Sequence, residues 1–130
     1  MPATKAGDWM SATVLTVDDS RSMRAALRET LEEIGHTVLE AEDGLAGLEV
    51  MENNPIDLLI TDLNMPRLNG IDFIRRVREQ DRFAGLPIVM LTTEGQADRM
   101  REGKSAGATA WIVKPFNELQ IEMLLKRLID

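Results

Sequence analysis

The chain has 130 residues, 44% hydrophobic and 28% charged, a balance typical of one globular domain and not of a disordered or membrane-spanning protein. Its formal net charge of −7 would repel a phosphate backbone, so direct nucleic-acid binding is disfavoured. The absence of cysteine excludes disulfides and thiolate metal sites and favours the cytoplasm, and no apolar run has the length of a signal peptide or membrane span.

Short apolar runs alternate with segments of helical periodicity along the chain. The first run, Thr13–Val17, stops at Asp18-Asp19, and a helix follows that Ser20 caps and Gly35 ends. Four further strands are predicted over residues 37–41, 57–61, 88–91 and 110–113, each followed by a helix, over 44–51, 71–80, 96–105 and 117–128. Five successive βα units predict a parallel sheet covered by helices on both faces, which is a doubly wound α/β fold.

One domain is predicted over residues 12–130, preceded by a flexible extension over residues 1–11. No linker, repeat or low-complexity run divides it, and no output domain is expected.

His36 follows Gly35 and is expected to be an exposed turn residue. Three arginines of the third helix are expected on its solvated face: Arg75, Arg76 and Arg78.

Polar side chains stand at the carboxyl ends of four predicted strands. Asp18 and Asp19 follow the first strand, Asp62 ends the third, Thr92 the fourth, and Lys114 follows the fifth. In a doubly wound sheet these ends meet at the ligand-binding edge, and three carboxylates there suit Mg²⁺, with Mn²⁺ as a substitute. A carboxylate nucleophile beside a metal, a cation and a hydroxyl can form an acyl phosphate, so Asp62 is the predicted phosphoacceptor. Each residue alone has a simpler interpretation as a cap, strand end or turn; only their joint placement favours a phosphoryl site.

The sequence resembles the CheY-like receiver domain of two-component response regulators over residues 12–130. The resemblance rests on the motifs VDDSRSMR, AEDG, ITDLNMPRLNGIDF, MLTTEG and GATAWIVKPF. It implies the flavodoxin-like strand order 2-1-3-4-5. It also implies that Asp62 takes its phosphoryl group from a sensor histidine kinase or a histidine phosphotransfer protein.

The resemblance further implies roles for individual residues. The backbone carbonyl of Asn64 would complete the metal ligands Asp18, Asp19 and Asp62, and the side chains of Asn64 and Glu94 would modulate the reaction. Lys114 would contact the phosphoryl group, and the Lys114–Pro115 peptide bond would be cis.

The resemblance also implies that Thr92 and Trp111 form a switch that responds to phosphorylation. Trp111 stands where the family usually has Tyr or Phe, and its simpler interpretation is a buried core aromatic. Phosphorylation would then reshape a protein-binding surface made by the fourth helix, the fifth strand and the fifth helix.

These features predict a stand-alone, monomeric signalling receiver that is not an enzyme, binds neither nucleic acid nor membrane, and acts in chemotaxis. A phosphorelay shuttle or phosphate sink uses the same site and remains an alternative. A phosphatase of the haloacid-dehalogenase type is a more remote one, because it needs an acid where Asn64 stands.

Overall fold

The structure is a computed structural model that describes residues 11–93 and 97–129. Its centre is a five-stranded parallel sheet with the order β2-β1-β3-β4-β5. The strands are β1 (Thr13–Val17), β2 (Thr37–Ala41), β3 (Leu58–Asp62), β4 (Ile88–Thr92) and β5 (Ala110–Val113). The helices are α1 (Arg21–Ile34), α2 (Gly44–Asn53), α3 (Gly70–Arg78), α4 (Ala97–Ala106) and α5 (Glu118–Ile129), with a short 3-10 helix, η1 (Asp81–Phe83). The predicted fold class and strand order are both confirmed.

The predicted helices and strands agree with the structure to within two residues at each end that the structure describes. The predicted start of α4 at Gln96 lies outside the described residues. Helix α3 begins at Gly70 because the side chain of Asn69 accepts a hydrogen bond from the backbone N–H of Asp72 and so caps the helix. Helix η1 was not predicted, since three residues are too few to show a periodicity.

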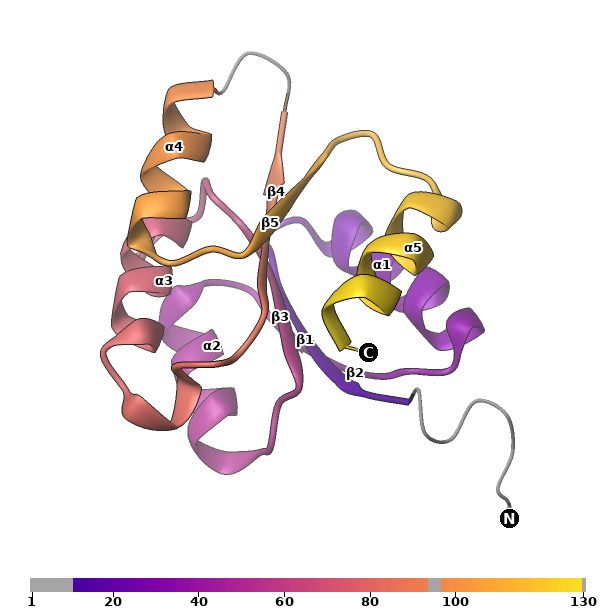
Figure 1. Cartoon of the computed structure of the whole chain (residues 1–130), viewed down its shortest axis with the longest axis horizontal. Coiled ribbons are helices and arrows are strands. Elements are labelled where there is room, and N and C mark those ends of the chain that lie inside the picture. Colours follow the sequence, from indigo (N-terminus) through magenta and orange to yellow (C-terminus); the bar gives the residue numbers. More distant parts are fainter. Residues whose placement is uncertain (1–10, 94–96, 130) are drawn as a thin grey trace.

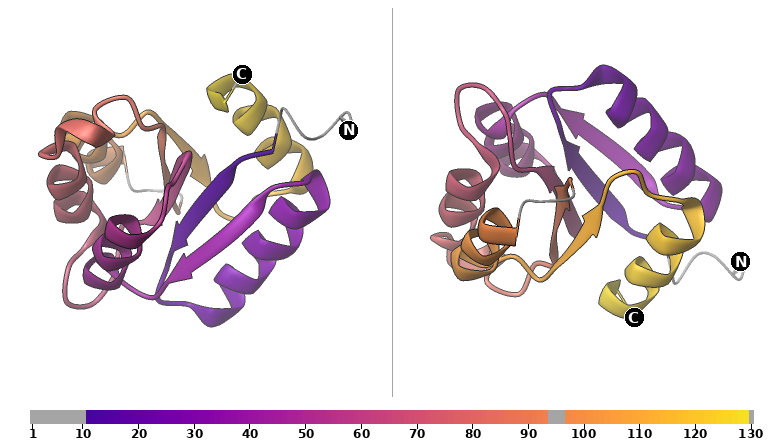
Figure 2. Two further views of the ribbon diagram at one scale, coloured as in Figure 1. Left: turned by 90° about the horizontal axis from the view of Figure 1, so that it is seen from below. Right: turned by 90° about the horizontal axis from the view of Figure 1, so that it is seen from above.

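The helices form one layer on each face of the sheet. Figure 1 shows α1 and α5 on one face and α2, α3 and α4 on the other, and Figure 2 shows the sheet between these layers. Successive residues of a strand point to opposite faces, so each buried strand supplies both layers. In β1, for example, Val14 packs with the α1 and α5 side chains, whereas Leu15 packs with those of α2 and α3. This two-sided burial explains why β1, β3 and β4 are largely apolar.

Two glycines allow helices to approach the sheet closely. A Cβ atom at Gly70 would lie 2.1 Å from the carbonyl oxygen of Asp62, and one at Gly103 would lie 1.9 Å from the Sδ atom of Met90. Neither position can hold a side chain without backbone or core movement. Gly70 therefore brings the start of α3 directly against the end of β3.

The amino-terminal boundary of the domain stays a prediction, because residues 1–10 lie outside the described part of the chain. Ser11 is already attached to the fold, since its hydroxyl donates a hydrogen bond to the carbonyl of Gly35 at 3.1 Å. Among the helices within residues 11–93 and 97–129, none is long and apolar enough to cross a membrane.

Two expectations about charged or titratable side chains are wrong. His36 is buried, with 8% of its surface exposed, and its Nδ1 atom accepts a hydrogen bond from the backbone N–H of Ala12 at 3.1 Å. Arg78 is half-buried and donates to the carbonyls of Gly107 at 3.0 Å and Phe83 at 2.6 Å, joining α3 to the loop after α4 and to η1. Arg75 and Arg76 are exposed as expected.

We expect the buried His36 to make stability depend on pH. Burial lowers the pKa of His36 below its ordinary value of 6.5, so the unfolded chain takes up the proton first. Its contribution to stability is therefore complete above about pH 6.5 and is lost as the pH falls towards the lower folded-state pKa. The loss should be on the order of 1 kcal/mol, the value of one buried hydrogen bond.

Urea denaturation between about pH 7.5 and about pH 5.5 measures this contribution. His36→Asn is the matched control, because its amide oxygen can accept the Ala12 N–H but does not titrate. The variant should lose less stability over this range than the wild type. Identical pH dependence in the two proteins would contradict the assignment to His36.

Candidate functional site

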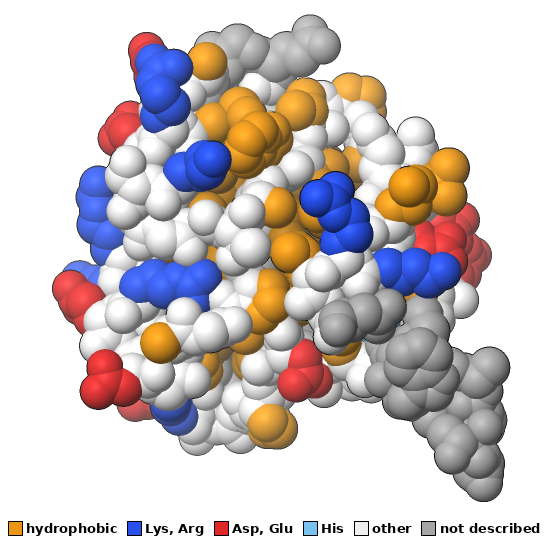
Figure 3. Space-filling view, viewed as in Figure 1, with side chains coloured by type: hydrophobic (Ala, Val, Ile, Leu, Met, Phe, Trp, Pro, Cys, Tyr) orange, Lys and Arg blue, Asp and Glu red, His pale blue; other side chains and the backbone are white. Residues whose placement is uncertain are grey.

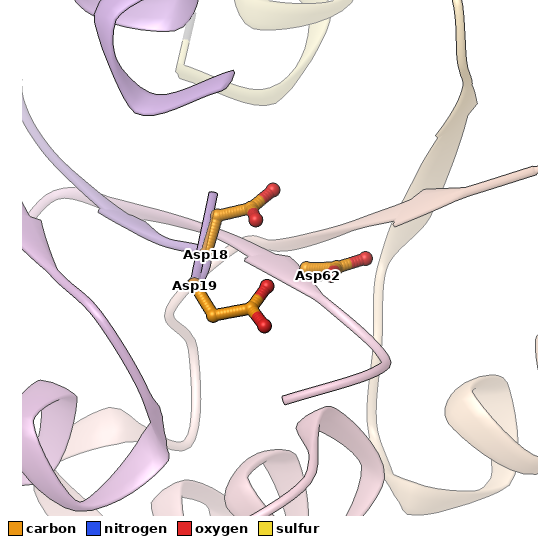
Figure 4. Close-up of side chains that lie close together, drawn as sticks. All are labelled: Asp18, Asp19 and Asp62. Carbon is orange, nitrogen blue, oxygen red and sulfur yellow. The ribbon is translucent and has the colours of Figure 1, made fainter. Parts of the chain in front are cut away.

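Three aspartates meet at the carboxyl ends of two neighbouring strands. Asp18 and Asp19 follow β1 directly, and Asp62 is the last residue of β3, which pairs with β1. Each offers a carboxylate oxygen within 4.8 Å of the others, and Figure 4 shows the three carboxylates side by side. After β1 the chain crosses to β2 on one side of it, and after β2 it returns to β3 on the other side, so the cluster lies at the point where the strand order reverses.

Lys114 and Thr92 complete this site from the next two strands. The Nζ atom of Lys114 lies 3.3 Å from Asp62 Oδ1 and 3.6 Å from Asp18 Oδ2. Lys114 is held there because its backbone N–H donates to the carbonyl of Thr92 at 2.7 Å. The Lys114–Pro115 peptide bond is cis. The Thr92 hydroxyl is buried and has no hydrogen-bond partner within the described part of the chain. A buried, unpaired hydroxyl is costly and is therefore a candidate donor for a bound oxyanion.

Burial and the neighbouring carboxylates raise the proton affinity of Asp18. The pKa of Asp18 lies above its ordinary value mainly because the side chain is buried, and the charges of Asp62 and Asp19 add to the shift. The backbone N–H of Ser20, which donates to Asp18 Oδ1 at 2.9 Å, and the charge of Lys114 oppose it without cancelling it. One ammonium group among three carboxylates leaves the site with excess negative charge.

The donor set fits a hard divalent cation. All three side chains offer carboxylate oxygens, and Asp18 Oδ2 is buried without a hydrogen-bond partner among the described residues, so it is available as a ligand. Asn64 follows in the loop after β3, and its side chain is exposed. Glu94, which was predicted to modulate the reaction, lies outside the described residues.

The sequence reading missed two arginines that contact the site from neighbouring helices. Arg24 of α1 donates to the carbonyl of Asp18 at 2.6 Å while its Nε donates to Glu40 of β2 at 3.1 Å, so it fixes the backbone that carries the first two aspartates. Arg99 of α4 donates to the side chain of Asn64. Arg24 lies within the VDDSRSMR motif and had a local signal, whereas Arg99 is 35 residues from Asn64 and had none.

A third arginine holds the loop after β3 to the loop before α2. Arg67 pairs with the buried Asp43 through two hydrogen bonds, of 2.7 and 3.0 Å, and Asp43 also caps α2 by accepting from Ala46. Arg67 has a left-handed backbone, with φ at 65°, which costs a residue with a side chain some strain. The bidentate pair lowers the pKa of Asp43 and offsets that strain.

Trp111 is not a buried core aromatic. Its side chain is 40% exposed on β5, and the Nζ atom of Lys104 lies 5.5 Å from the centre of its ring. The interpretation as a core residue is therefore wrong, and the predicted role as a switch stays a prediction.

Comparison with known proteins identifies the family. Residues 14–126 match the response regulator receiver domain. The chain is 35% identical over 118 residues to the chemotaxis protein CheY of Pseudomonas aeruginosa, covering 90% of this chain and 95% of that protein. It is 44% identical over 105 residues to the chemotaxis protein CheY1 of Helicobacter pylori, covering 79% and 85%. The solved structure of CheY4 of Vibrio cholerae superposes with a TM-score of 0.86 at 42% identity, covering 91% of this chain and 98% of that one. The chain therefore belongs to the response regulator receiver family.

Proposed function

We propose that this receiver takes a phosphoryl group on Asp62 from a histidine kinase or a histidine phosphotransfer protein and passes the signal to a protein target. The observation that carries the proposal is the placement of Asp62 among two further carboxylates, the Lys114 ammonium group and the buried Thr92 hydroxyl, which has no hydrogen-bond partner in the described part of the chain. A nucleophile, a cation and a free donor are what acyl phosphate formation requires.

In the proposed reaction an Asp62 oxygen attacks the phosphorus atom of a phosphohistidine. The new P–O bond forms as the P–N bond breaks, and the imidazole leaves with the bonding electrons. Lys114, 3.3 Å from Asp62 in the free protein, would pair with a phosphoryl oxygen, and the Thr92 hydroxyl would donate to another. The chain would thus promote its own phosphorylation and dephosphorylation without being an enzyme for a separate substrate.

A bound Mg²⁺ ion, for which Mn²⁺ can substitute, would neutralise charge between the Asp62 carboxylate and the incoming phosphoryl group. Asp18, Asp19 and Asp62 would hold it, together with the backbone carbonyl of Asn64. The carboxylate oxygens within 4.8 Å of one another support this ligand set, as does Asp18 Oδ2, which is buried and accepts no hydrogen bond among the described residues.

We expect Mg²⁺ to raise the melting temperature, because it offsets the repulsion among the three carboxylates and binds only the folded site. For the same reason, Asp19→Asn should stabilise the metal-free protein by about 1 kcal/mol, or roughly 3–5 °C in Tm. Thermal unfolding with EDTA and with Mg²⁺ measures both effects.

The matched control is Glu52→Gln, which removes one negative charge from the exposed end of α2. It should leave the metal-free Tm nearly unchanged and keep the full response to Mg²⁺. An Asp19→Asn protein that melts at or below the wild type without metal would contradict the clustering of charge.

We assign the output to the surface formed by α4, β5 and α5. We assign the pathway to chemotaxis, because the relatives are named chemotaxis proteins. Figure 3 shows hydrophobic side chains gathered on this face between Lys and Arg side chains. The large exposed hydrophobic residues there are Trp111, Val113, Leu119 and Met123. We place the protein in the cytoplasm as a monomer that acts through this surface without binding nucleic acid or membrane.

Incubation with acetyl phosphate and Mg²⁺, followed by intact-mass measurement, tests the proposal. One added phosphoryl group per chain is expected, and no adduct would overturn it. A phosphorelay shuttle would also return the group to a histidine phosphotransfer protein. Transfer in both directions would therefore favour that alternative over a terminal signalling receiver.

A further inference from the structure

Arg99, in the first turn of α4, reaches across to the loop after β3. Its Nη1 atom donates to the side-chain oxygen of Asn64 at 3.3 Å, and its Nη2 atom donates to the carbonyl of Leu63 at 3.4 Å. Its Nε atom is buried without a hydrogen-bond partner within residues 11–93 and 97–129. The guanidinium group of Arg99 therefore contacts the loop through two of its nitrogens while the third makes no hydrogen bond among the described residues.

The two residues that Arg99 contacts differ in burial. Leu63 has no exposed surface, and its carbonyl also accepts the backbone N–H of Gly70 at 2.9 Å, so it is fixed relative to Asp62. Asn64 is exposed, two residues after Asp62. Arg99 is thus anchored on Leu63 and orients the side chain of Asn64, the freer of the two.

Loss of the phosphoryl group from Asp62 needs attack by a water molecule on the phosphorus atom. The water oxygen forms a bond to phosphorus, the bond between phosphorus and Asp62 breaks, and Asp62 leaves as a carboxylate while the water's proton passes to solvent or the departing phosphate. Attack is faster when a hydrogen-bond acceptor at the rim orients that water. Asn64, exposed and two residues after Asp62, offers an acceptor in its side-chain oxygen, but the Arg99 guanidinium already donates to that oxygen and draws electron density from it.

We propose that Arg99 is a positioning residue that lengthens the lifetime of the phosphoryl group on Asp62 by occupying the side-chain oxygen of Asn64. This inference rests on the proposed function. It makes α4 a part of the site as well as a part of the output surface, so the helix position affects how long the signal lasts.

Arg99→Ala should shorten the phosphoryl lifetime roughly three- to tenfold, because the freed Asn64 oxygen can orient the attacking water. The protein is labelled with radioactive acetyl phosphate and Mg²⁺, the donor is removed, and the decay of protein-bound label is followed. Arg101→Ala is the matched control: Arg101 lies on the same helix, is exposed and pairs with Asp98. It removes the same charge from α4 and should leave the lifetime unchanged.

A double-mutant comparison separates positioning from a general effect on α4. In an Asn64→Ala background, Arg99→Ala should no longer change the lifetime, because the oxygen it occupies is gone. A wild-type lifetime in Arg99→Ala, or an equal effect of that change with and without Asn64, would overturn the inference. If the wild type takes no label on Asp62, the proposed function itself fails, and the two failures are distinguishable.

Discussion

Asp62→Asn should abolish phosphorylation by acetyl phosphate and Mg²⁺ while leaving the fold intact. Asp62 ends the central strand β3, with its oxygen 3.3 Å from the Lys114 ammonium group. An amide has no anionic oxygen to attack phosphorus, so the rate of labelling should fall by at least about a thousandfold, as for loss of a covalent nucleophile. The shape changes little, because Asn and Asp have nearly the same volume.

Intact-mass measurement of the labelled protein provides the result, and far-UV circular dichroism confirms folding. Asp57→Asn is the matched control, since Asp57 precedes β3 at its opposite end and accepts a hydrogen bond from the Thr13 N–H that an amide oxygen can also accept. That variant should be labelled like the wild type. Stoichiometric, lasting label on Asp62→Asn would mean that another carboxylate is the phosphoacceptor.

The fold and the acidic cluster could be predicted because both follow from local patterns. The apolar run Thr13–Val17 ends abruptly at two aspartates, and the parallel sheet that such runs imply brings all carboxyl ends to one edge. The position of Lys114 and Asp62 on the same edge follows from the parallel direction of the strands. The distance of 3.3 Å between the Lys114 Nζ atom and the Asp62 carboxylate could not be predicted, because sequence spacing does not set side-chain conformation.

The wrong or missing predictions share a physical cause. His36, Arg78 and Arg99 bond to partners brought close by packing between elements, at sequence separations of 24, 29 and 35 residues. A residue after a helix-ending glycine is usually exposed, but His36 lies beside the start of β1, where it accepts the Ala12 N–H. A helical arginine is usually solvated, but the loops beside Arg78 present carbonyls that need a donor.

The second large effect concerns Trp111. Thr92 pairs with Val113 and Met90 pairs with Trp111 across β4 and β5, so Thr92 and Trp111 emerge on the same face of the sheet. A phosphoryl group on Asp62 would draw the unpaired Thr92 hydroxyl towards it and vacate space on that face. The indole, 40% exposed beneath Lys104 in the structure, could then turn inward and bury apolar area.

Trp111→Ala should therefore be phosphorylated nearly normally and yet lose much of the phosphate-dependent change at the surface formed by α4, β5 and α5. The phosphoryl group can shift the two arrangements only by its differential contacts with them, about 1–3 kcal/mol, or roughly 5- to 150-fold in target affinity. The measurement is affinity for the protein target of the proposed chemotaxis pathway, with and without beryllium trifluoride as phosphoryl mimic. Amide hydrogen exchange in α4 and α5 gives a readout that needs no target.

Leu119→Ala is the matched control, because Leu119 is 63% exposed on α5 and contributes apolar area to the same surface. Its loss should weaken target binding to a similar degree with and without the mimic, leaving the ratio of affinities at the wild-type value. Trp111→Ala should instead bring that ratio close to one, because no large side chain is then present to move into the space that Thr92 vacates. A Trp111→Ala protein with the wild-type ratio, and with wild-type changes in hydrogen exchange, would show that the indole only contributes contact area and that the phosphoryl signal reaches α4 by another route.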